Sequence, residues 1–150
     1  MSAKPKFRSL GGPEEDLFVS LVRTTELLSR NVEKVLKAAD VSPTQYNVLR
    51  ILRGAPEGLQ CTEIARRMIT RDPDITRLLD RLEKRELISR ARDSKDRRVV
   101  LTKITKQGLT LLRDLDRPVT EMHKAHLGHL GRQGLQSLMD LLETARNESV

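Results

Sequence analysis

A β-prone segment interrupts a chain that is otherwise patterned for helices. Residues 93–96 form a charged turn, and β-branched residues dominate the segment 99–105 that follows. This pattern predicts strands over 88–92 and 97–103, joined as an antiparallel hairpin. Leucine-rich segments on both sides repeat apolar residues at spacings of three, four or seven, which indicates amphipathic helices. The chain is therefore expected to be mainly α, with one small β-hairpin.

The first two helices have clear boundaries in the sequence. The pattern predicts a helix over about 13–39, which at 1.5 Å per residue would be roughly 35–40 Å long. That length exceeds what one small core requires and indicates a further role. A second helix follows Ser42 and Gln45, which match the two members of a capping box, while Pro43 suits the first helical position. Gly54 is expected to end this helix.

Two more helices precede the hairpin. A short one is expected over 62–68 with Thr62 as its N-cap, and a longer one over 73–86. Asp72 is the expected N-cap of the longer helix, because an acceptor side chain before Pro73 satisfies free amides of the first turn. A short helix, a capped helix and then a hairpin is the order of a winged helix-turn-helix, in which the hairpin is the wing.

Helices also follow the hairpin. One is expected to start near Thr105, with Pro118 kinking or ending it, and the last covers about 132–147. No apolar run approaches the ~20 residues of a membrane span, and no secretory signal is recognisable. The single cysteine excludes an internal disulfide, which fits a reducing compartment. We therefore expect a single cytoplasmic domain covering residues 1–150.

The basic charge is concentrated in the middle of the chain. Of the net charge of +7, residues 61–103 carry +5, from 13 Lys or Arg against 8 Asp or Glu. A basic segment between nearly neutral ones indicates a polyanion partner, although a solvated mixed-charge surface fits the composition equally well. The aromatic residues are Phe7, Phe18 and Tyr46, too few for the ring stacking that usually binds single-stranded nucleic acid. Duplex DNA is therefore the favoured polyanion.

A winged helix-turn-helix binds duplex DNA with defined parts of its surface. The N-terminal half of its second helix faces base edges in the major groove, where Arg77 would bind guanine in a bidentate manner. The basic tip of the hairpin reaches the flanking minor groove, where narrow A·T tracts concentrate negative potential. The residues expected to contact DNA are Asp74, Thr76, Arg77 and Arg81 on the helix and Lys95, Arg97 and Arg98 on the hairpin.

Four segments, in this order, resemble the MarR family of bacterial transcriptional regulators. The segments are SPTQYNVLRIL, TEIARRM, DITRLLDRLEKRELISR and DSKDRRVVLTKITKQG, and the resemblance extends over about residues 13–147. It implies a winged helix-turn-helix lobe over about 42–104. It also implies a dimerisation lobe built from helices at about 13–39 and 105–147.

The resemblance further implies how such a protein works. A homodimer would bind a pseudo-palindromic operator as a repressor, with half-sites about one helical turn apart. At the tip of the wing, Asp96 would brace Arg98 where the latter enters the minor groove. A small aromatic or phenolic effector between the lobes would release the DNA, with Tyr46 as a candidate contact and no other cofactor expected.

Several residues admit other interpretations. Cys61 precedes the short helix, where a thiol is placed to sense oxidants, but a small, partly buried residue is the favoured interpretation. His123 and His126 would share a helix face and bind a metal with a carboxylate, but a polar helix end near His129 is favoured and no metal is expected. No nucleophile motif or phosphate-binding loop occurs, so an enzyme is not expected. The alternative to DNA binding is a helical protein-interaction module whose basic hairpin binds an acidic protein.

Overall fold

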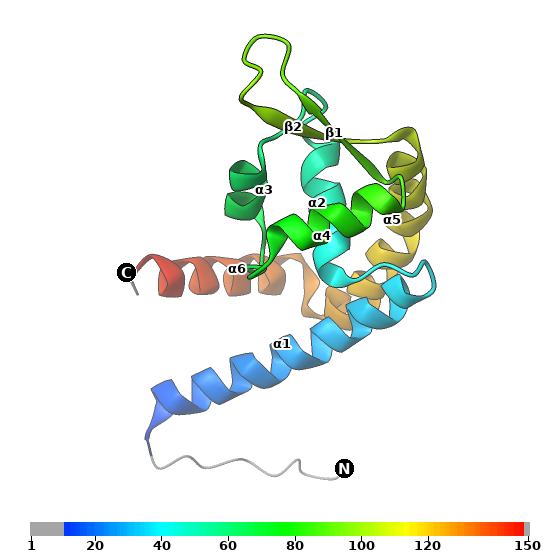
Figure 1. Ribbon diagram of the computed structural model, residues 1–150. Coiled ribbons are helices and arrows are strands. Elements are labelled where there is room, and N and C mark those ends of the chain that lie inside the picture. Colours follow the sequence, from blue (N-terminus) through cyan, green and yellow to red (C-terminus); the bar gives the residue numbers. More distant parts are fainter. Residues whose placement is uncertain (1–10, 149–150) are drawn as a thin grey trace.

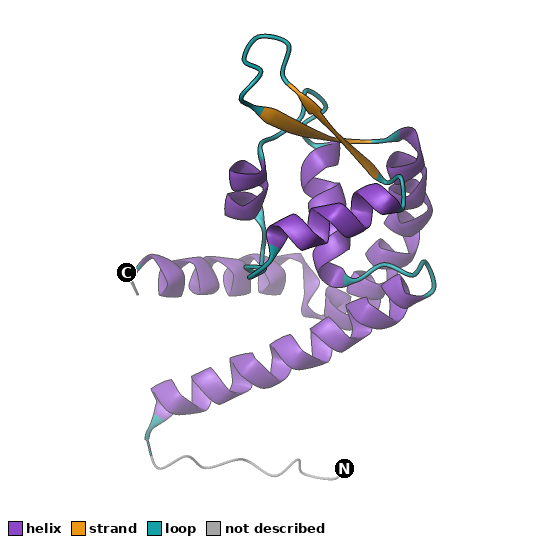
Figure 2. Cartoon of the chain, viewed as in Figure 1, coloured by secondary structure: helices purple, strands orange, loops and turns teal. Residues whose placement is uncertain are grey.

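The computed structural model describes residues 11–148 and contains seven helical elements and two strands within them. Their bounds are α1 Pro13–Lys37, α2 Pro43–Arg53, α3 Cys61–Arg67, α4 Ile75–Lys84, β1 Ile88–Arg92, β2 Val100–Ile104, α5 Lys106–Leu127, the 3₁₀ turn η1 Gly128–Leu130 and α6 Gly131–Asn147. Helices α2 to α4 and the wing β1–β2 form one lobe, and α1 and α6 extend from it (Figure 1). Figure 2 shows helices dominating, with the wing as the described sheet, which confirms the mainly α fold class.

The core is built around α2. Its capping box forms as predicted: Ser42 Oγ accepts the Gln45 amide and Gln45 Oε1 accepts the Ser42 amide, both at 3.1 Å. Neighbours on several sides, namely α1, α3, α5 and β2, pack around the helix, so its apolar face is removed from water. Side chains buried in this core include Leu36, Val48, Leu49, Leu52, Ile64, Leu79, Leu82, Ile88 and Leu112.

Helix α3 begins slightly earlier than predicted. It starts at Cys61, and Thr62 lies inside the first turn instead of capping it. The reason is that Gln60 is extended while its carbonyl already accepts the Ile64 amide at 3.0 Å. Gln60 is therefore the N-cap, and Thr62 as N-cap is wrong.

Helix α4 is shorter than predicted at both ends. It begins at Ile75, because Asp74 Oδ1 accepts the Arg77 amide at 3.1 Å and caps the helix. Asp72, the predicted cap, instead accepts the Asp74 amide at 2.8 Å in the turn that leads to the helix. At the other end Glu86 adopts a φ of 59°, a left-handed conformation that stops the helix and turns the chain into β1.

The wing has the predicted first strand but a longer turn. Strand β2 begins at Val100, so Arg97 lies in the loop and not in the strand as predicted. Two backbone hydrogen bonds close this loop: the Asp93 amide donates to the Val99 carbonyl at 2.8 Å, and the Val99 amide donates to the Asp96 carbonyl at 3.0 Å. The loop thus has its own hydrogen-bonded structure between the strands.

Hydrogen bonds join the base of the wing to the rest of its lobe. Leu59 and Thr102 form a reciprocal bridge, with N···O distances of 3.0 and 2.8 Å, which no local sequence pattern predicts. Thr105 Oγ1 donates to the Glu86 carbonyl at 2.6 Å. The first residues of α5, the turn after α4 and the chain before α3 therefore meet at this base.

Pro118 lies inside α5 without ending it. The helix continues to Leu127, so the expectation that Pro118 ends it is wrong. A proline removes one intrahelical hydrogen bond, but Leu115 and Val119 beside it are buried in the core, and this packing favours the continuous helix. None of the described helices is long and apolar enough to cross a membrane.

Substituting Gly108 tests how closely α5 approaches the base of the wing. A Cβ at Gly108 would clash with the Leu87 carbonyl oxygen and lie 2.7 Å from Ile104 Cγ1. We expect Gly108→Ala to lower the free energy of unfolding by roughly 1–3 kcal/mol, the usual cost of overpacking, in urea denaturation. Gly128→Ala is the matched control, because nothing lies within 4 Å of a Cβ there. Equal losses in the two variants would contradict this account.

Candidate nucleic-acid interface

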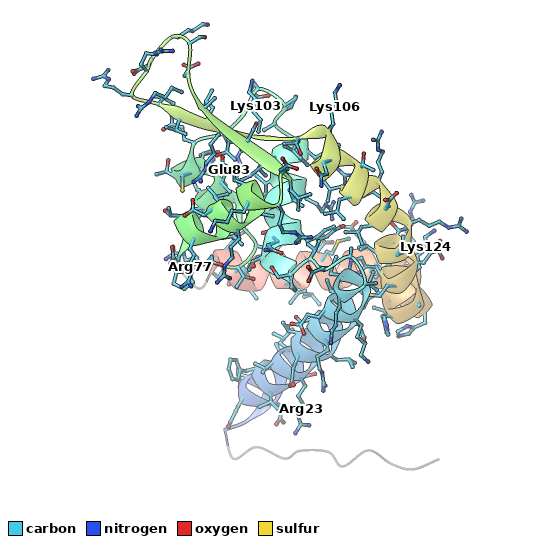
Figure 3. All side chains as sticks on the ribbon, turned by 45° about the vertical axis from the view of Figure 1, so that its right-hand side comes forward. Arg23, Arg77, Glu83, Lys103, Lys106 and Lys124 are labelled. Atoms are coloured by element: carbon cyan, nitrogen blue, oxygen red, sulfur yellow. The ribbon has the colours of Figure 1, made fainter. Side chains whose placement is uncertain are left out.

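Helix α4 buries one face and leaves the other open. Leu78, Leu79 and Leu82 face the core, so Thr76 and Arg77 are exposed near the N-terminal end of the helix. Arg77 lies at the outer edge of the lobe (Figure 3). Its backbone amide donates to Asp74, but its guanidinium forms no hydrogen bond or ion pair within the described part of the chain. An exposed arginine without a partner in this position is placed to bind a base edge.

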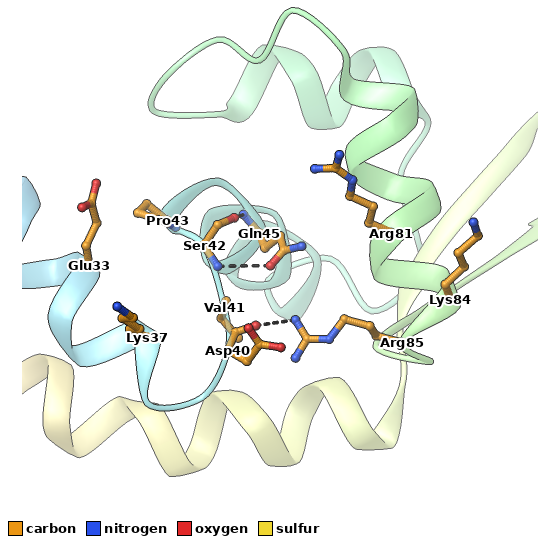
Figure 4. A pocket seen from close by; sticks show the side chains of 10 residues that line it. All are labelled: Glu33, Lys37, Asp40, Val41, Ser42, Pro43, Gln45, Arg81, Lys84 and Arg85. Atoms are coloured by element: carbon orange, nitrogen blue, oxygen red, sulfur yellow. Dashed lines mark hydrogen bonds between the residues drawn. The ribbon is translucent and has the colours of Figure 1, made fainter.

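The other two predicted residues of α4 have neighbours within the protein. The carboxylate of Asp74 is partly used as the helix cap, through one oxygen. Arg81, one turn after Arg77, lines a cleft of about 560 Å³ opposite the N-terminus of α2 (Figure 4). In the same cleft Arg85 donates to the Asp40 carbonyl at 2.6 Å. The structure therefore leaves Arg77 more open to a partner than Asp74 or Arg81.

Asp96 and Arg98 form an ion pair at the tip of the wing. The Asp96 carboxylate accepts the Arg98 amide at 3.0 Å and the guanidinium Nε and Nη2 at 3.2 and 3.3 Å. The hydrogen bonds from Arg98 hold the pKa of Asp96 below its ordinary value. The side chain of Arg98 is nevertheless 91% exposed. The carboxylate thus orients the arginine without removing it from solvent.

Lys95 and Arg97, the other predicted wing residues, are exposed beside this pair. Arg92, which was not among the predicted residues, donates to the Arg97 carbonyl at 2.7 Å and so supports the loop from the end of β1. Figure 3 shows side chains pointing outward in several directions from this tip. Three cations in an exposed loop give the tip a positive potential that favours a polyanion.

Arg90 joins the wing to α4, and it was not among the predicted site residues. Its Nε and Nη2 donate to the two oxygens of Glu83 at 3.1 Å each, and Nη2 also donates to Asp80 at 2.5 Å. These hydrogen bonds, to Glu83 first and Asp80 second, raise the pKa of Arg90, and the contact with Arg90 lowers the pKa of Glu83. Figure 3 shows Glu83 between α4 and the wing. A signal in the sequence was the spacing of Asp80 and Glu83, which places both on one helix face.

A second cleft, of about 890 Å³, lies between α1, α2 and the chain before α4. Tyr46 is part of its wall, with the Arg50 guanidinium carbon 5.8 Å from the ring centre. Asn47 Oδ1 accepts the Ile69 amide at 2.9 Å, and Ile69 is 89% exposed at the rim. The size and mixed lining suit a small organic ligand. Other walls come from Leu28, Val32, Ile51 and His123.

The histidines near the end of α5 lie in different environments. His123 faces the second cleft, whereas His126 Nδ1 lies 3.4 Å from Asn31 Nδ2 on α1. His129 belongs to the turn η1. Among residues 11–148, no three His, Cys, Asp or Glu side chains form a group that would hold a metal ion.

Comparisons with known proteins assign the chain to a family. The sequence model of the MarR family matches residues 41–100. The HTH-type transcriptional regulator FarR of Neisseria gonorrhoeae is 31% identical over 108 residues, which are 71% of this chain and 73% of FarR. A MarR transcription factor from Planctomyces limnophilus is 39% identical with a TM-score of 0.68, over 92% of this chain and 98% of that one.

Two structures of CouR extend the comparison. The transcriptional repressor CouR bound to a 23-mer DNA duplex has a TM-score of 0.80 and 28% identity, over 93% of this chain and 98% of that one. CouR from Rhodococcus jostii RHA1 bound to p-coumaroyl-CoA has a TM-score of 0.77 and 26% identity, over 92% and 94%. The winged lobe and the long helices both lie within these matches. The chain therefore belongs to the MarR family of transcriptional regulators.

Proposed function

We propose that this MarR-family protein is a homodimeric repressor that binds a pseudo-palindromic operator and releases it when a small molecule binds. The observation that carries the proposal is the pair of exposed arginines, Arg77 on α4 and the Asp96-braced Arg98 on the wing. CouR, which has been solved on a DNA duplex, shares the fold and supports the same use of these elements here. It also favours DNA binding over a protein-interaction module. The protein would act in the cytoplasm, where its operator is.

Each predicted residue has a place in this mode of binding. Arg77 is proposed to bind guanine in the major groove through two hydrogen bonds. Arg98 enters the flanking minor groove, and its neighbours bind phosphates, which fix the register on the duplex. The remaining DNA-binding candidates are Asp74, through its second carboxylate oxygen, Thr76, Arg81, Lys95 and Arg97.

Homodimer formation is proposed from the apolar surface on α1 and α6. Helix α6 has no buried residue, and its Leu141 is 68% exposed, as Phe18 of α1 is 66% exposed. Apolar area of this kind is unfavourable in water. A second copy whose α1 and α6 pack against these surfaces would bury them and create the two-fold symmetry that a pseudo-palindrome requires. The chain would then be one domain with a winged lobe and a dimerisation lobe.

The cleft beside Tyr46 is the proposed effector site. An aromatic or phenolic ligand there would touch α1 and α2 and also Ile69, which precedes α4. Because the cleft spans the two lobes, a ligand that fits one lobe spacing better shifts the population toward it. The CouR complex with p-coumaroyl-CoA supports a ligand-binding role for this fold.

The first experiment is fluorescence anisotropy with promoter DNA flanking the protein's own gene, at several salt concentrations. We expect tight binding that resists competitor DNA and falls steeply with salt, because bound cations release counterions from the phosphates. Weak binding of equal strength to every duplex would contradict the proposal.

Removing Arg77 is expected to change which sequence is bound. Arg77→Ala should bind the parental operator about tenfold or more weakly, since the guanine contact is lost, and should discriminate less at the corresponding base pair. Gel shifts on a panel of single-base operator variants measure both effects. Arg113→Ala, on α5, removes the same charge elsewhere and should leave the preference intact. Unchanged affinity of Arg77→Ala across the panel would overturn the assignment.

Removing Arg98 is expected to weaken binding on all sequences. Arg98→Ala should reduce the slope of log affinity against log salt by about 1, the value for one lost phosphate-region cation. Asp96→Asn removes a negative charge near the DNA, yet it should also weaken binding, because the brace is lost. Tighter binding by Asp96→Asn would show that Asp96 does not position Arg98.

Introducing a charge on α6 tests the dimer. Leu141→Glu should yield monomers in light scattering at micromolar concentration, since a buried carboxylate without a partner is unfavourable. Gln133→Glu adds the same charge at another exposed position of α6 and should remain dimeric. Dimers of unchanged stability in Leu141→Glu would place the interface elsewhere.

A further inference from the structure

We infer that Arg90 is a positioning residue that fixes the angle between the wing and α4, so that Arg98 and Arg77 meet the DNA together. The group formed by Arg90, Asp80 and Glu83 is called the Arg90 clamp below. The inference rests on the proposed DNA-binding function and assigns to it a residue that does not itself contact DNA.

The geometry of the clamp suits a rigid connection. The guanidinium edge formed by Nε and Nη2 meets both oxygens of Glu83, which fixes the plane of the group, while Asp80 binds Nη2 from one turn earlier on α4. Two carboxylates on successive turns restrict both rotation and sliding of β1 along the helix. Bidentate, charge-assisted hydrogen bonds of this kind are stronger and more directional than neutral ones.

The position of Arg90 along the wing allows the clamp to control where the tip lies. The base of the wing is fixed by the bridge between Leu59 and Thr102 and by the bond from Thr105 to Glu86. Arg98 lies in the loop beyond the far ends of the strands. Arg90 lies in the middle of β1, opposite Thr102. A change of angle between β1 and α4 would therefore produce its largest displacement at the tip.

Arg90 is poorly placed to bind DNA itself. Its side chain is 25% exposed, and both Nε and Nη2 are engaged by carboxylates. The clamp carries two carboxylates against one guanidinium, so its net charge opposes a phosphate. Arg98, in contrast, is 91% exposed with a single carboxylate partner. The two arginines thus have separate tasks, one within the protein and one toward the DNA.

The chain offers two ways to open the clamp and a matched control. Arg90→Gln removes a positive charge, whereas Asp80→Asn combined with Glu83→Gln removes two negative charges. Electrostatics alone would therefore weaken DNA binding in the first variant and strengthen it in the second. Arg53→Gln is the control: Arg53 makes a similar two-oxygen ion pair with Asp116, at 3.0 and 2.8 Å, and its side chain is 32% exposed. That pair joins α2 to α5 and includes no residue of α4 or of the wing.

The first measurement needs no DNA. Spin labels on Thr76 of α4 and Val100 of β2, in a Cys61→Ser background, report the angle between helix and wing through their distance distribution. Labelled protein is mixed with excess unlabelled protein, so that each dimer contains at most one labelled protomer and only distances within one chain are measured. We expect a narrow distribution in the parent and in Arg53→Gln, and a broader or shifted one in both clamp variants. An unchanged distribution in both clamp variants would overturn the inference.

The second measurement is a double-mutant cycle on DNA. In the parent, Arg98→Ala should weaken binding about tenfold. In either clamp variant the same substitution should cost less than about threefold, since Arg98 is no longer delivered to the groove. In the Arg53→Gln background, Arg98→Ala should again weaken DNA binding about tenfold. A general loss of stability does not change how Arg98 meets the DNA, so the two effects on affinity add. Full additivity in both clamp variants would contradict the positioning role.

The salt dependence separates positioning from contact. A direct phosphate contact by Arg90 would reduce the salt slope of the Arg98→Ala protein by a further ~1 when Arg90→Gln is added. We expect no such further reduction, and its observation would assign Arg90 to the DNA contacts instead. If the parent binds no duplex specifically, the proposed function fails, while the spin-label distances still decide whether Arg90 sets the angle of the wing.

Discussion

The burial of α2 is the constraint on which the rest of the structure depends. This helix packs against α1, α3, α5 and β2, so both lobes take their positions from one element. Its Val48, Leu49 and Leu52 lie in the core, while Tyr46, Asn47 and Arg50 line the cleft beside α1. Core packing and ligand access therefore use adjacent residues of one helix. The capping box at Ser42 fixes where this helix starts and thus which side chains face each way.

The charge of the basic segment is distributed by pairing. Its carboxylates are mostly engaged within the protein: Glu63 accepts hydrogen bonds from Arg66 and Arg67, which lower its pKa to about 2, and Asp80 and Glu83 hold Arg90. Other carboxylates cap α4 and brace the tip of the wing. The basic side chains that no carboxylate neutralises consequently lie on the open face of α4 and on the loop of the wing. Position, more than net charge, makes this surface suitable for DNA.

Much of the fold could be predicted from the sequence, because local signals and the tertiary structure agree in most segments. Apolar spacing predicted the long first helix, the capping box predicted the start of α2, and the β-branched run predicted the wing. Predicted helix boundaries were wrong where two side chains could cap the same helix, as with Asp72 and Asp74. They were also wrong where tertiary packing overrode a local signal, as at Pro118. The exposed arginines could be inferred from their place in the motif. Only Tyr46 could be assigned to a cleft from the sequence, and the partners of Arg90 and Asn47 could not be named, since these contacts depend on how distant elements meet.

The hydrogen bond between Asn47 and Ile69 has a thermodynamic consequence for a regulator of this kind. It ties the wall of the cleft to the segment that leads into α4, so a ligand in the cleft and DNA on α4 would act on one stretch of backbone. Linkage between two sites is reciprocal: a ligand that weakens DNA binding by some factor is itself bound more weakly, by the same factor, when DNA is present. Molecules seated on the operator would then respond at higher ligand concentration than those free in solution. The sensitivity of such a switch would be a property of the protein–DNA complex and not of the protein alone.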